Sequence, residues 1–275
     1  FCQSIELSVA PFEVLETQDD AARITRDGVR NTHLDPFSTP LIMKTSRNGY
    51  DGKGQQIVQH LSDTLEHWNS LGNVPCIVEQ KLDLDAEFSV IIARGEDGEI
   101  ASFMPTENVH VDGILDVSTA PSQLDSQLLE QGQLAAINIA EKLNYIGVLA
   151  VEFFVSHNIL FVNELAPRPH NSGHWTLDAA CASQFEQQVR ALVGKSLGDP
   201  SMTCSAVAMV NLLGDRWTHG EPQFDKVIAN SSAHVHLYGK KTARPGRKMG
   251  HLTVTGETVD AVAENAVSLR TAITR

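Results

Sequence analysis

Cysteine is scarce in this chain, and its spacing excludes two classes of small stabilised fold. The four cysteines, Cys2, Cys76, Cys181 and Cys204, are widely separated and form no CxxC pair. The pattern therefore predicts neither a structural zinc site nor a disulfide framework. Cys76 and Cys204 lie beside apolar stretches, where free cysteine is typically a small buried residue. We expect a protein of the reducing cytoplasm.

Long apolar runs and positive charge are also in short supply. No run approaches the roughly 20 apolar residues that a membrane-spanning helix needs. The 21 lysines and arginines face 34 aspartates and glutamates, a net charge of −13. That balance argues against nucleic acid or an anionic membrane as partner. It leaves open a small anionic ligand, which meets only the charges of its own pocket.

The start of the chain lacks the features of a protein N-terminus. The sequence begins "FCQSIELSVAPF", without methionine and without a secretory signal. This stretch resembles the interior of a protein, so we expect a further segment upstream.

The 275 residues predict a soluble α+β protein with more than one domain. We expect helices over 18–27, 62–71 with Ser62 as N-cap, 123–143, 176–194 and 258–273. We expect strands over 40–46, 75–82, 88–95, 99–105, 147–155, 159–166, 205–212, 233–238 and 251–255. The segment "KSLGDPS" (195–201) is the best candidate for a linker.

The strands 147–155 and 159–166 carry one glutamate each and predict a β-hairpin. Side chains alternate along a strand, so Glu152 shares a face with Val148 and Ala150, and Glu164 shares one with Val162. With a connection of three to four residues, the two carboxylates fall opposite or diagonal to each other.

Two carboxylates on apolar strands repel and lose hydration unless a cation lies between them. Mg²⁺ suits such a pair, because it takes one or two carboxylates together with phosphate oxygens. In the alternative, one glutamate faces solvent and the other pairs with Arg168. The hairpin alone does not decide between them.

A glycine-rich loop follows the strand that ends near Lys44. "RNGYDGKGQ" (47–55) has three glycines in six residues, and its backbone amides can hold a phosphate. It matches neither of the common phosphate-loop motifs. Lys44 could reach an α-phosphate or be a solvated strand end. "VEQ" (78–80) ends an apolar strand in the way that adenine-binding linkers do, which is a weak signal by itself.

A cluster of positive charge stands near the C-terminus. "GKKTARPGRKMGH" (239–251) holds five lysines and arginines between positions 240 and 248. In an acidic chain, this cluster favours an anion pocket, such as one for a sugar phosphate. The alternative is a solvated basic turn.

Taken in order, these motifs resemble the N5-carboxyaminoimidazole ribonucleotide synthase family of ATP-grasp enzymes, which act in purine biosynthesis. The resemblance runs from about residue 9 to the end. It rests on "GYDGKGQ", "CIVEQ", "ENVHVDGIL", "VLAVEFF", "VNELAPRPHNSGHW" and "ARPGRKMGH". It implies a ligase that makes carboxyphosphate from ATP and bicarbonate and then carboxylates 5-aminoimidazole ribonucleotide.

The resemblance also implies roles for individual residues. Those implied to bind ATP are Lys44, Gly49, Tyr50, Asp51, Gly52, Lys53, Gly54, Gln55, Glu79, Gln80, Lys81, Leu82, Glu87 (on the ribose), His110, Asn163 and Glu164. Those implied to contact the ribonucleotide are Tyr50, Asp51, Lys53, His170, Lys240 and Arg247. Glu152 and Glu164 would hold Mg²⁺, and Arg168 and Lys44 would act in catalysis, with Arg168 on the bicarbonate. Lys53 stands where the family often has arginine, so its bidentate contact is in question.

The implied fold is an ATP-grasp module over 1–196, followed by a small α+β domain over 197–275 that binds the substrate phosphate. Within the module, 35–82 would carry the glycine loop and 83–196 the metal site. The family's N-terminal Rossmann-like domain has no counterpart here. Two rival functions stay open: another ATP-grasp carboxylate–amine ligase, or a nucleotide-binding module without turnover. Family members tend to form homodimers.

Overall fold

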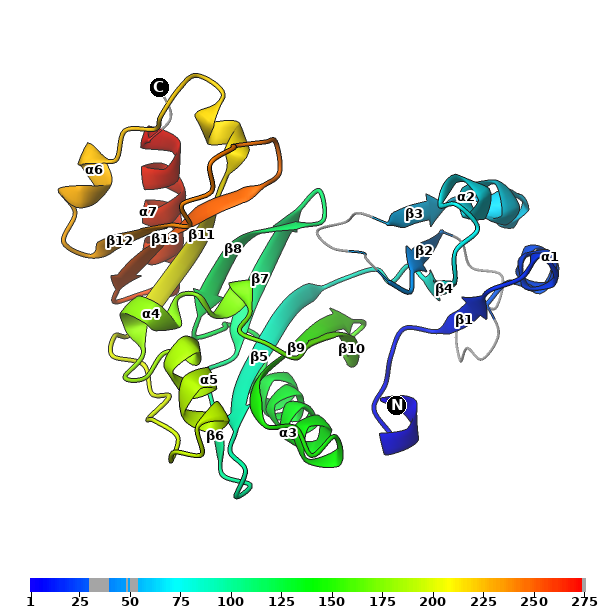
Figure 1. Cartoon of the computed structure of the whole chain (residues 1–275), viewed down its shortest axis with the longest axis horizontal. Coiled ribbons are helices and arrows are strands. Elements are labelled where there is room, and N and C mark those ends of the chain that lie inside the picture. Colours follow the sequence, from blue (N-terminus) through cyan, green and yellow to red (C-terminus); the bar gives the residue numbers. More distant parts are fainter. Residues whose placement is uncertain (30–39, 48, 50–53, 274–275) are drawn as a thin grey trace. The chain divides into compact units, whose positions relative to one another are not determined.

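The computed structural model describes residues 1–29, 40–47, 49 and 54–273. The chain forms two compact units, Phe1–Leu84 and Asp85–Arg275 (Figure 1). None of the helices in the described part of the chain is long and apolar enough to cross a membrane. Each unit has its own sheet and its own buried core.

The first unit is built on a four-stranded antiparallel sheet in the order β1-β4-β2-β3. Its elements are η1 (Gln3–Ile5), β1 (Phe12–Leu15), α1 (Gln18–Asp27), β2 (Leu41–Thr45), β3 (Gln55–Val58), η2 (Leu61–Asp63), α2 (Thr64–Ser70) and β4 (Cys76–Gln80). The core joins the sheet to the two α-helices through Leu15, Ile24, Met43 and Trp68, and it includes Cys76. The burial expected for Cys76 is confirmed, whereas Cys204 is only partly buried.

The two helices of this unit begin differently. Thr17 caps α1 through a capping box with Asp20, which satisfies amide groups that the first turn leaves unpaired. The helix predicted over 18–27 is therefore confirmed. Ser62 is not an N-cap: it lies inside η2, its hydroxyl donates to Asp63 Oδ1 at 2.8 Å, and α2 begins only at Thr64.

The second unit is built on a nine-stranded antiparallel sheet in the order β10-β9-β5-β7-β8-β11-β13-β12, with β6 pairing β5. Its strands are β5 (Ala86–Arg94), β6 (Ile100–Ser102), β7 (Thr106–Val111), β8 (Ile114–Ala120), β9 (Gly147–Ser156), β10 (Ile159–Ala166), β11 (Ala206–Leu213), β12 (Ala233–Leu237) and β13 (Lys248–Gly256). Its helices are α3 (Ser126–Lys142), η3 (Asn171–Gly173), α4 (Thr176–Ala179), α5 (Gln184–Leu192), η4 (Gly214–Trp217), α6 (Asp225–Ile228) and α7 (Val259–Ala272).

The two faces of this sheet are covered by different elements. On one face Phe88 stacks on Phe153 at 5.1 Å, and α3 packs closely because a Cβ at Gly132 would lie 2.6 Å from the Phe88 ring. On the other face Ile91 and Trp175 join a buried apolar cluster. The helix α7 packs on β11 and β13 farther along the sheet (Figure 1).

Two predictions about this unit are wrong. The helix expected over 176–194 is broken into α4 and α5, because Ser183 starts a new helix by accepting a hydrogen bond from the Glu186 amide. Two strands that the sequence analysis omitted, β7 and β8, form a hairpin in the middle of the sheet. Its turn places Asp112 and Gly113 at φ 51° and 74°.

The compact units separate at Leu84 and Asp85. The strand β11, which follows the candidate linker, pairs with both β8 and β13, so the sheet continues across that segment. The division into 35–82, 83–196 and 197–275 stays a prediction.

Candidate active site

Two glutamates face each other across the hairpin of β9 and β10. His157 and Asn158 form a two-residue turn with φ of 50° and 61°, the left-handed conformation that tight hairpins require. The connection is thus shorter than the three to four residues expected. The register pairs Glu164 directly with Glu152, which confirms that the carboxylates lie opposite each other.

This pairing depends on a β-bulge at Asn163. The register shifts between Val162, which pairs with Phe153, and Glu164, which pairs with Glu152. Directly paired residues point to the same face, so Val162 and Glu164 lie on opposite faces. The prediction that they share a face is wrong, because the extra residue interrupts the alternation. The Asn163 amide lies on the Glu152 side and donates to its Oε2 at 3.4 Å.

The two carboxylates repel each other across the hairpin. Burial, and then the charge of Glu164, raise the pKa of Glu152. The Glu152 side chain is 16% exposed, so water screens this repulsion poorly. Arg168 is exposed and donates to the Pro169 carbonyl at 3.0 Å, and within the described residues no ion pair joins it to a glutamate. The site thus fits a hard divalent cation such as Mg²⁺.

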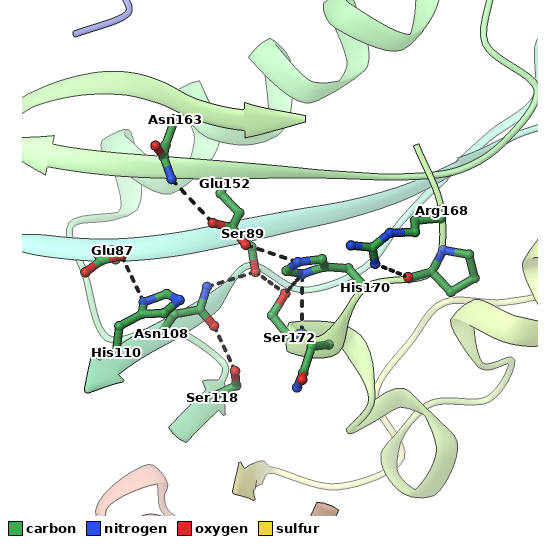
Figure 2. Close-up of polar contacts among 12 residues, drawn as sticks. Glu87, Ser89, Asn108, His110, Ser118, Glu152, Asn163, Arg168, His170 and Ser172 are labelled. Atoms are coloured by element: carbon green, nitrogen blue, oxygen red, sulfur yellow. Dashed lines mark hydrogen bonds and ion pairs between the residues drawn. The ribbon is translucent and has the colours of Figure 1, made fainter. Parts of the chain in front are cut away.

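A carboxylate–imidazole pair connects β5 to β7. His110 Nδ1 lies 2.9 Å from Glu87 Oε2 (Figure 2). Burial lowers the pKa of His110, but the hydrogen bond and charge of Glu87, together with the charge of Glu152, outweigh burial and raise it. When protonated, the ring offsets part of the negative charge here. Both residues were predicted to lie near the nucleotide.

A second such pair involves Glu152 itself. His170 Nε2 lies 3.1 Å from Glu152 Oε1 (Figure 2). Burial, and then the charges of Arg168 and Lys248, lower the pKa of His170 to about 3. The imidazole is therefore neutral near pH 7, and the contact is a hydrogen bond rather than an ion pair.

The first unit has a lysine–glutamate pair of its own. Lys44 Nζ on β2 lies 2.5 Å from Glu79 Oε2 on β4, and both side chains are less than one-fifth exposed. Gly54 has φ of 74° and its carbonyl accepts from the Thr45 amide at 2.9 Å, which closes the base of the glycine loop. Gln55 then pairs with Lys44 in the sheet.

The remaining nucleotide candidates of this unit lie around the loop and after β4. Gly49 is exposed, and Gln80 is the last residue of β4. The amide of Lys81 donates to the Pro40 carbonyl at 3.1 Å, and Leu82 is buried. Tyr50, Asp51, Gly52 and Lys53 lie outside the described residues.

The cationic turn near the C-terminus is held by its own backbone carbonyls and by Asp215, whose Oδ2 accepts from the Gly246 amide at 2.8 Å. Arg247 donates to the Thr242 carbonyl at 2.8 Å, and Lys240 donates to the Lys248 carbonyl. The ammonium of Lys240 also lies 5.3 Å from the centre of the Tyr238 ring. Lys248 begins β13, and its charge lowers the pKa of both His170 and Glu152. Sequence analysis noted the cluster but did not single out this lysine.

Among the described residues, one further group of side chains is close enough to suggest a metal. Ligand atoms of Asp178, His236 and His251 lie within 4.8 Å of one another. The rings of His236 and His251 stack at 15° to each other, so one ion cannot lie in the plane of both without rotation of a ring. His236 Nε2 already contacts both Asp178 oxygens at 3.0 Å. The group is therefore a hydrogen-bonded pair, Asp178 and His236, with the His251 ring stacked on His236.

Comparison with known families identifies two segments of the chain. The ATP-grasp domain model matches residues 1–185. The model of the phosphoribosylaminoimidazole carboxylase C-terminal domain matches residues 207–265.

Curated relatives share the same name. The N5-carboxyaminoimidazole ribonucleotide synthase of Bacillus subtilis is 37% identical over 254 residues, which is 91% of this chain and 63% of the relative. The synthase of Brucella melitensis is 44% identical over 77% of this chain and 58% of the relative. The chain thus spans about three-fifths of the length of these relatives.

Solved structures agree with the fold. An ADP complex of purK, an N5-carboxyaminoimidazole ribonucleotide synthetase, has a TM-score of 0.84 and 34% identity, over 97% of this chain and 68% of that chain. The synthase of Aspergillus clavatus, in complex with ADP and 5-aminoimidazole ribonucleotide, has a TM-score of 0.84 and 25% identity, over 100% of this chain and 71% of that chain. The chain therefore belongs to the ATP-grasp family, in its N5-carboxyaminoimidazole ribonucleotide synthase branch.

Proposed function

We propose that this chain binds Mg²⁺-ATP and carries out the ATP- and bicarbonate-dependent carboxylation of 5-aminoimidazole ribonucleotide. The product would be N5-carboxyaminoimidazole ribonucleotide, formed through carboxyphosphate in purine (IMP) biosynthesis. The observation that carries the proposal is the facing pair Glu152 and Glu164, aligned by a bulge, in which burial and the charge of Glu164 raise the pKa of Glu152. The relative from Aspergillus clavatus, solved with ADP and 5-aminoimidazole ribonucleotide, supports the choice of acceptor.

Residues of the second unit would bind the metal ion, the bicarbonate and the ribose. Glu152 and Glu164 would hold Mg²⁺, with Asn163 beside them. When bound, Mg²⁺ spreads the negative charge of the phosphates and of the transferring phosphoryl group. Arg168, exposed at the end of β10, would bind bicarbonate and its phosphorylated form. Glu87 would accept the hydroxyl groups of the ribose.

The remaining groups would orient the two substrates. Lys44 offers its ammonium to a phosphate, and its present partner Glu79 keeps that ammonium extended in place. His170, Lys240 and Arg247 would bind the aminoimidazole ribonucleotide. Fixing the acceptor amine next to a short-lived acid anhydride would raise the rate, because orientation replaces a chance encounter. The protein must also exclude water from that anhydride.

A second candidate function is a nucleotide-binding module without turnover. It is favoured by the match of the ATP-grasp domain model to residues 1–185, while the chain spans 63% of the Bacillus subtilis relative. Such a module would bind Mg²⁺-ATP and show no response to the ribonucleotide.

One set of measurements separates these functions. Calorimetry with Mg²⁺-ATP is followed by a phosphate-release assay with and without 5-aminoimidazole ribonucleotide. Ribonucleotide-stimulated release supports the carboxylation, and binding without stimulation supports the second candidate. Absence of Mg²⁺-ATP binding overturns both. Arg247→Ala should weaken the ribonucleotide far more than ATP, and the opposite result would move the cationic turn to the nucleotide site.

We also propose that the protein is a cytoplasmic homodimer. Its four cysteines are free thiols, as a reducing compartment allows. On α5, Phe185, Val189 and Leu192 are 37%, 60% and 65% exposed at helical spacing, an apolar stripe of the kind that subunits cover. Light scattering of the purified chain measures the assembly, and a monomer at micromolar concentration would contradict the dimer.

A further inference from the structure

Four polar side chains without an assigned role are buried behind His170. Ser89 on β5, Ser118 on β8 and Ser172 in η3 are fully buried, and Asn108 on β7 is 6% exposed. Burying a hydroxyl or amide costs free energy unless it finds a hydrogen-bond partner. Four such groups from four separate elements meet here and bond to one another (Figure 2).

The hydrogen bonds between these groups run in one direction. The Ser118 hydroxyl donates to Asn108 Oδ1 at 2.8 Å, and Asn108 Nδ2 donates to Ser89 Oγ at 3.1 Å. The Ser89 hydroxyl then donates to Ser172 Oγ at 2.7 Å. Since each oxygen accepts from the preceding group, its own hydrogen is directed to the next one. The last hydroxyl, that of Ser172, lies 2.9 Å from His170 Nδ1.

Ser172, at the end of this series of hydrogen bonds, fixes the tautomer of His170. The backbone amide of Ser172 also points at His170 Nδ1, at 3.4 Å. An amide N–H can only donate, so Nδ1 must carry a lone pair, whichever way the Asn108 amide is turned. A neutral ring then has its one hydrogen on Nε2, which faces Glu152 Oε1 at 3.1 Å.

The backbone of His170 is held from the other side. Gln184 accepts from the His170 amide at 2.8 Å and donates to the His170 carbonyl at 2.7 Å. Gly173 is needed for this approach, since a Cβ there would lie 2.1 Å from Ile91 Cδ1 and 2.8 Å from Gln184 Oε1. The ring therefore has a fixed base, and the amide and the hydroxyl of Ser172 both keep the hydrogen off Nδ1.

We infer that Ser172, supported by the buried chain Ser118–Asn108–Ser89, is a positioning residue: it keeps the hydrogen of His170 on Nε2, where it orients the Glu152 carboxylate. With the amide of Asn163 at Oε2, each oxygen of Glu152 then receives one hydrogen bond. Each oxygen keeps a second lone pair for a cation. Groups that orient a metal ligand in this way are typically worth about 10–100-fold in affinity or activity. The consequence for Mg²⁺ rests on the proposed function; the tautomer does not.

The tautomer can be measured without nucleotide or metal. Long-range ¹H–¹⁵N correlation spectra of histidine-labelled protein at pH 7.5 distinguish the two neutral tautomers, and His170→Asn identifies the signals of His170. We expect the Nε2–H tautomer in the wild-type protein and a measurably larger Nδ1–H population in Ser172→Ala, which loses the hydroxyl at 2.9 Å and keeps the more distant amide at 3.4 Å. Ser118→Ala, at the far end of the buried chain, should shift the populations less and in the same direction. An Nδ1–H tautomer in the wild type, or populations unchanged in Ser172→Ala, overturns the inference.

The functional consequence is measured as the dependence of ATP affinity on Mg²⁺. Ser172→Ala should raise the Mg²⁺ concentration needed for half-maximal ATP binding by about 10-fold or more. Thr106→Val is the matched control, because it also removes a buried hydroxyl. That hydroxyl accepts from Trp175 Nε1 at 3.0 Å and makes no hydrogen bond to the four buried polar side chains. It should leave the Mg²⁺ dependence unchanged. An equal loss in both variants would show a general packing effect and overturn the inference.

The two proposals fail in different ways. If the wild-type protein binds no Mg²⁺-ATP, the proposed function fails, while the spectra still decide the tautomer. If the wild type binds Mg²⁺-ATP and Ser172→Ala binds it with the same Mg²⁺ dependence, the positioning role fails and the proposed function stands.

Discussion

Two carboxylate–imidazole pairs of the second unit have nearly the same separation, yet the pKa values of their imidazoles are shifted in opposite directions. Glu87 and His110 are 2.9 Å apart, and Glu152 and His170 are 3.1 Å apart. The His110 and His170 side chains are 21% and 12% exposed. The pKa of His110 is raised, whereas that of His170 is lowered to about 3.

The difference comes from the surroundings of each ring. Burial lowers the pKa of both imidazoles. His110 has two carboxylates near it, Glu87 and Glu152, which together outweigh burial. Around His170 the next largest effects are the cations Arg168 and Lys248, which add to burial. A carboxylate partner therefore does not by itself set the charge of a histidine; the remaining neighbours decide it.

The largest expected effect distinguishes the proposed metal ligands, Glu152 and Glu164, from Glu87, the carboxylate of the other pair. Glu152→Gln, and likewise Glu164→Gln, should lower Mg²⁺-dependent ATP turnover by more than about 100-fold, since even partners that only orient a metal ligand are worth about 10–100-fold. Glu87→Gln, in the other pair, should mainly weaken ATP binding. Turnover is measured as phosphate release at saturating ATP and varied Mg²⁺.

Stability provides the control for this prediction. The raised pKa of Glu152 shows that its ionised form is unfavourable in the folded protein, so Glu152→Gln should unfold at the same temperature as the wild type or higher. Full turnover in either glutamine variant would remove the metal assignment. Loss of turnover together with a much lower unfolding temperature would point to misfolding.

A smaller effect should appear in the acid dependence of stability. The pKa of His170 is about 3 in the folded chain, and an unfolded histidine titrates near 6.5. Between these values the unfolded state binds the extra proton, so stability is lost as the pH falls. His170→Asn should reduce the slope of unfolding free energy against pH by up to about 1.4 kcal/mol per pH unit. Urea unfolding at pH 7, 5.5 and 4.5 measures the slope, and an unchanged slope would contradict the neutral ring.

The smallest effect concerns the other imidazole. Because the pKa of His110 is raised, its contribution to stability is complete below about pH 6.5 and is lost as the pH rises through the higher folded value. Glu87→Gln removes the hydrogen bond and charge of its partner, so the pKa of His110 should fall. An NMR titration of the ring measures the change, with His170 as the reference. If His110 titrates unchanged, Glu87 is not the cause of the shift.

The parts of this molecule that local sequence signals govern could be predicted. Thr17 and Asp20 mark the start of α1, and the hairpin of β9 and β10 follows from two apolar runs and a short polar turn. The presence of Glu152 and Glu164 on neighbouring strands follows from that hairpin, whereas their direct pairing needs the bulge at Asn163. A signal was also present for two features that were omitted: "HVDGIL" is a strong hairpin pattern, and "SQFE" is a helix-start pattern.

The rest depends on contacts that the sequence does not display. A bulge at Asn163 leaves no local signature in an alternating strand, so the face of Val162 could not be predicted. Ser89, Asn108 and Ser172 resemble ordinary small polar residues until β5, β7 and η3 come together. The shift of His170 needs charges from distant positions such as Lys248.

The bulge lets one strand of the hairpin carry one residue more than the other while the two glutamates still face each other. Val162 pairs with Phe153 and Glu164 with Glu152, so Asn163 is the extra residue and has no partner of its own on β9. Removing Asn163 would therefore leave Glu164 opposite Glu152 and take away the amide that donates to Glu152 Oε2. What this position gives the site is thus a hydrogen bond to a carboxylate, held at a place where a regular strand would have no residue to spare.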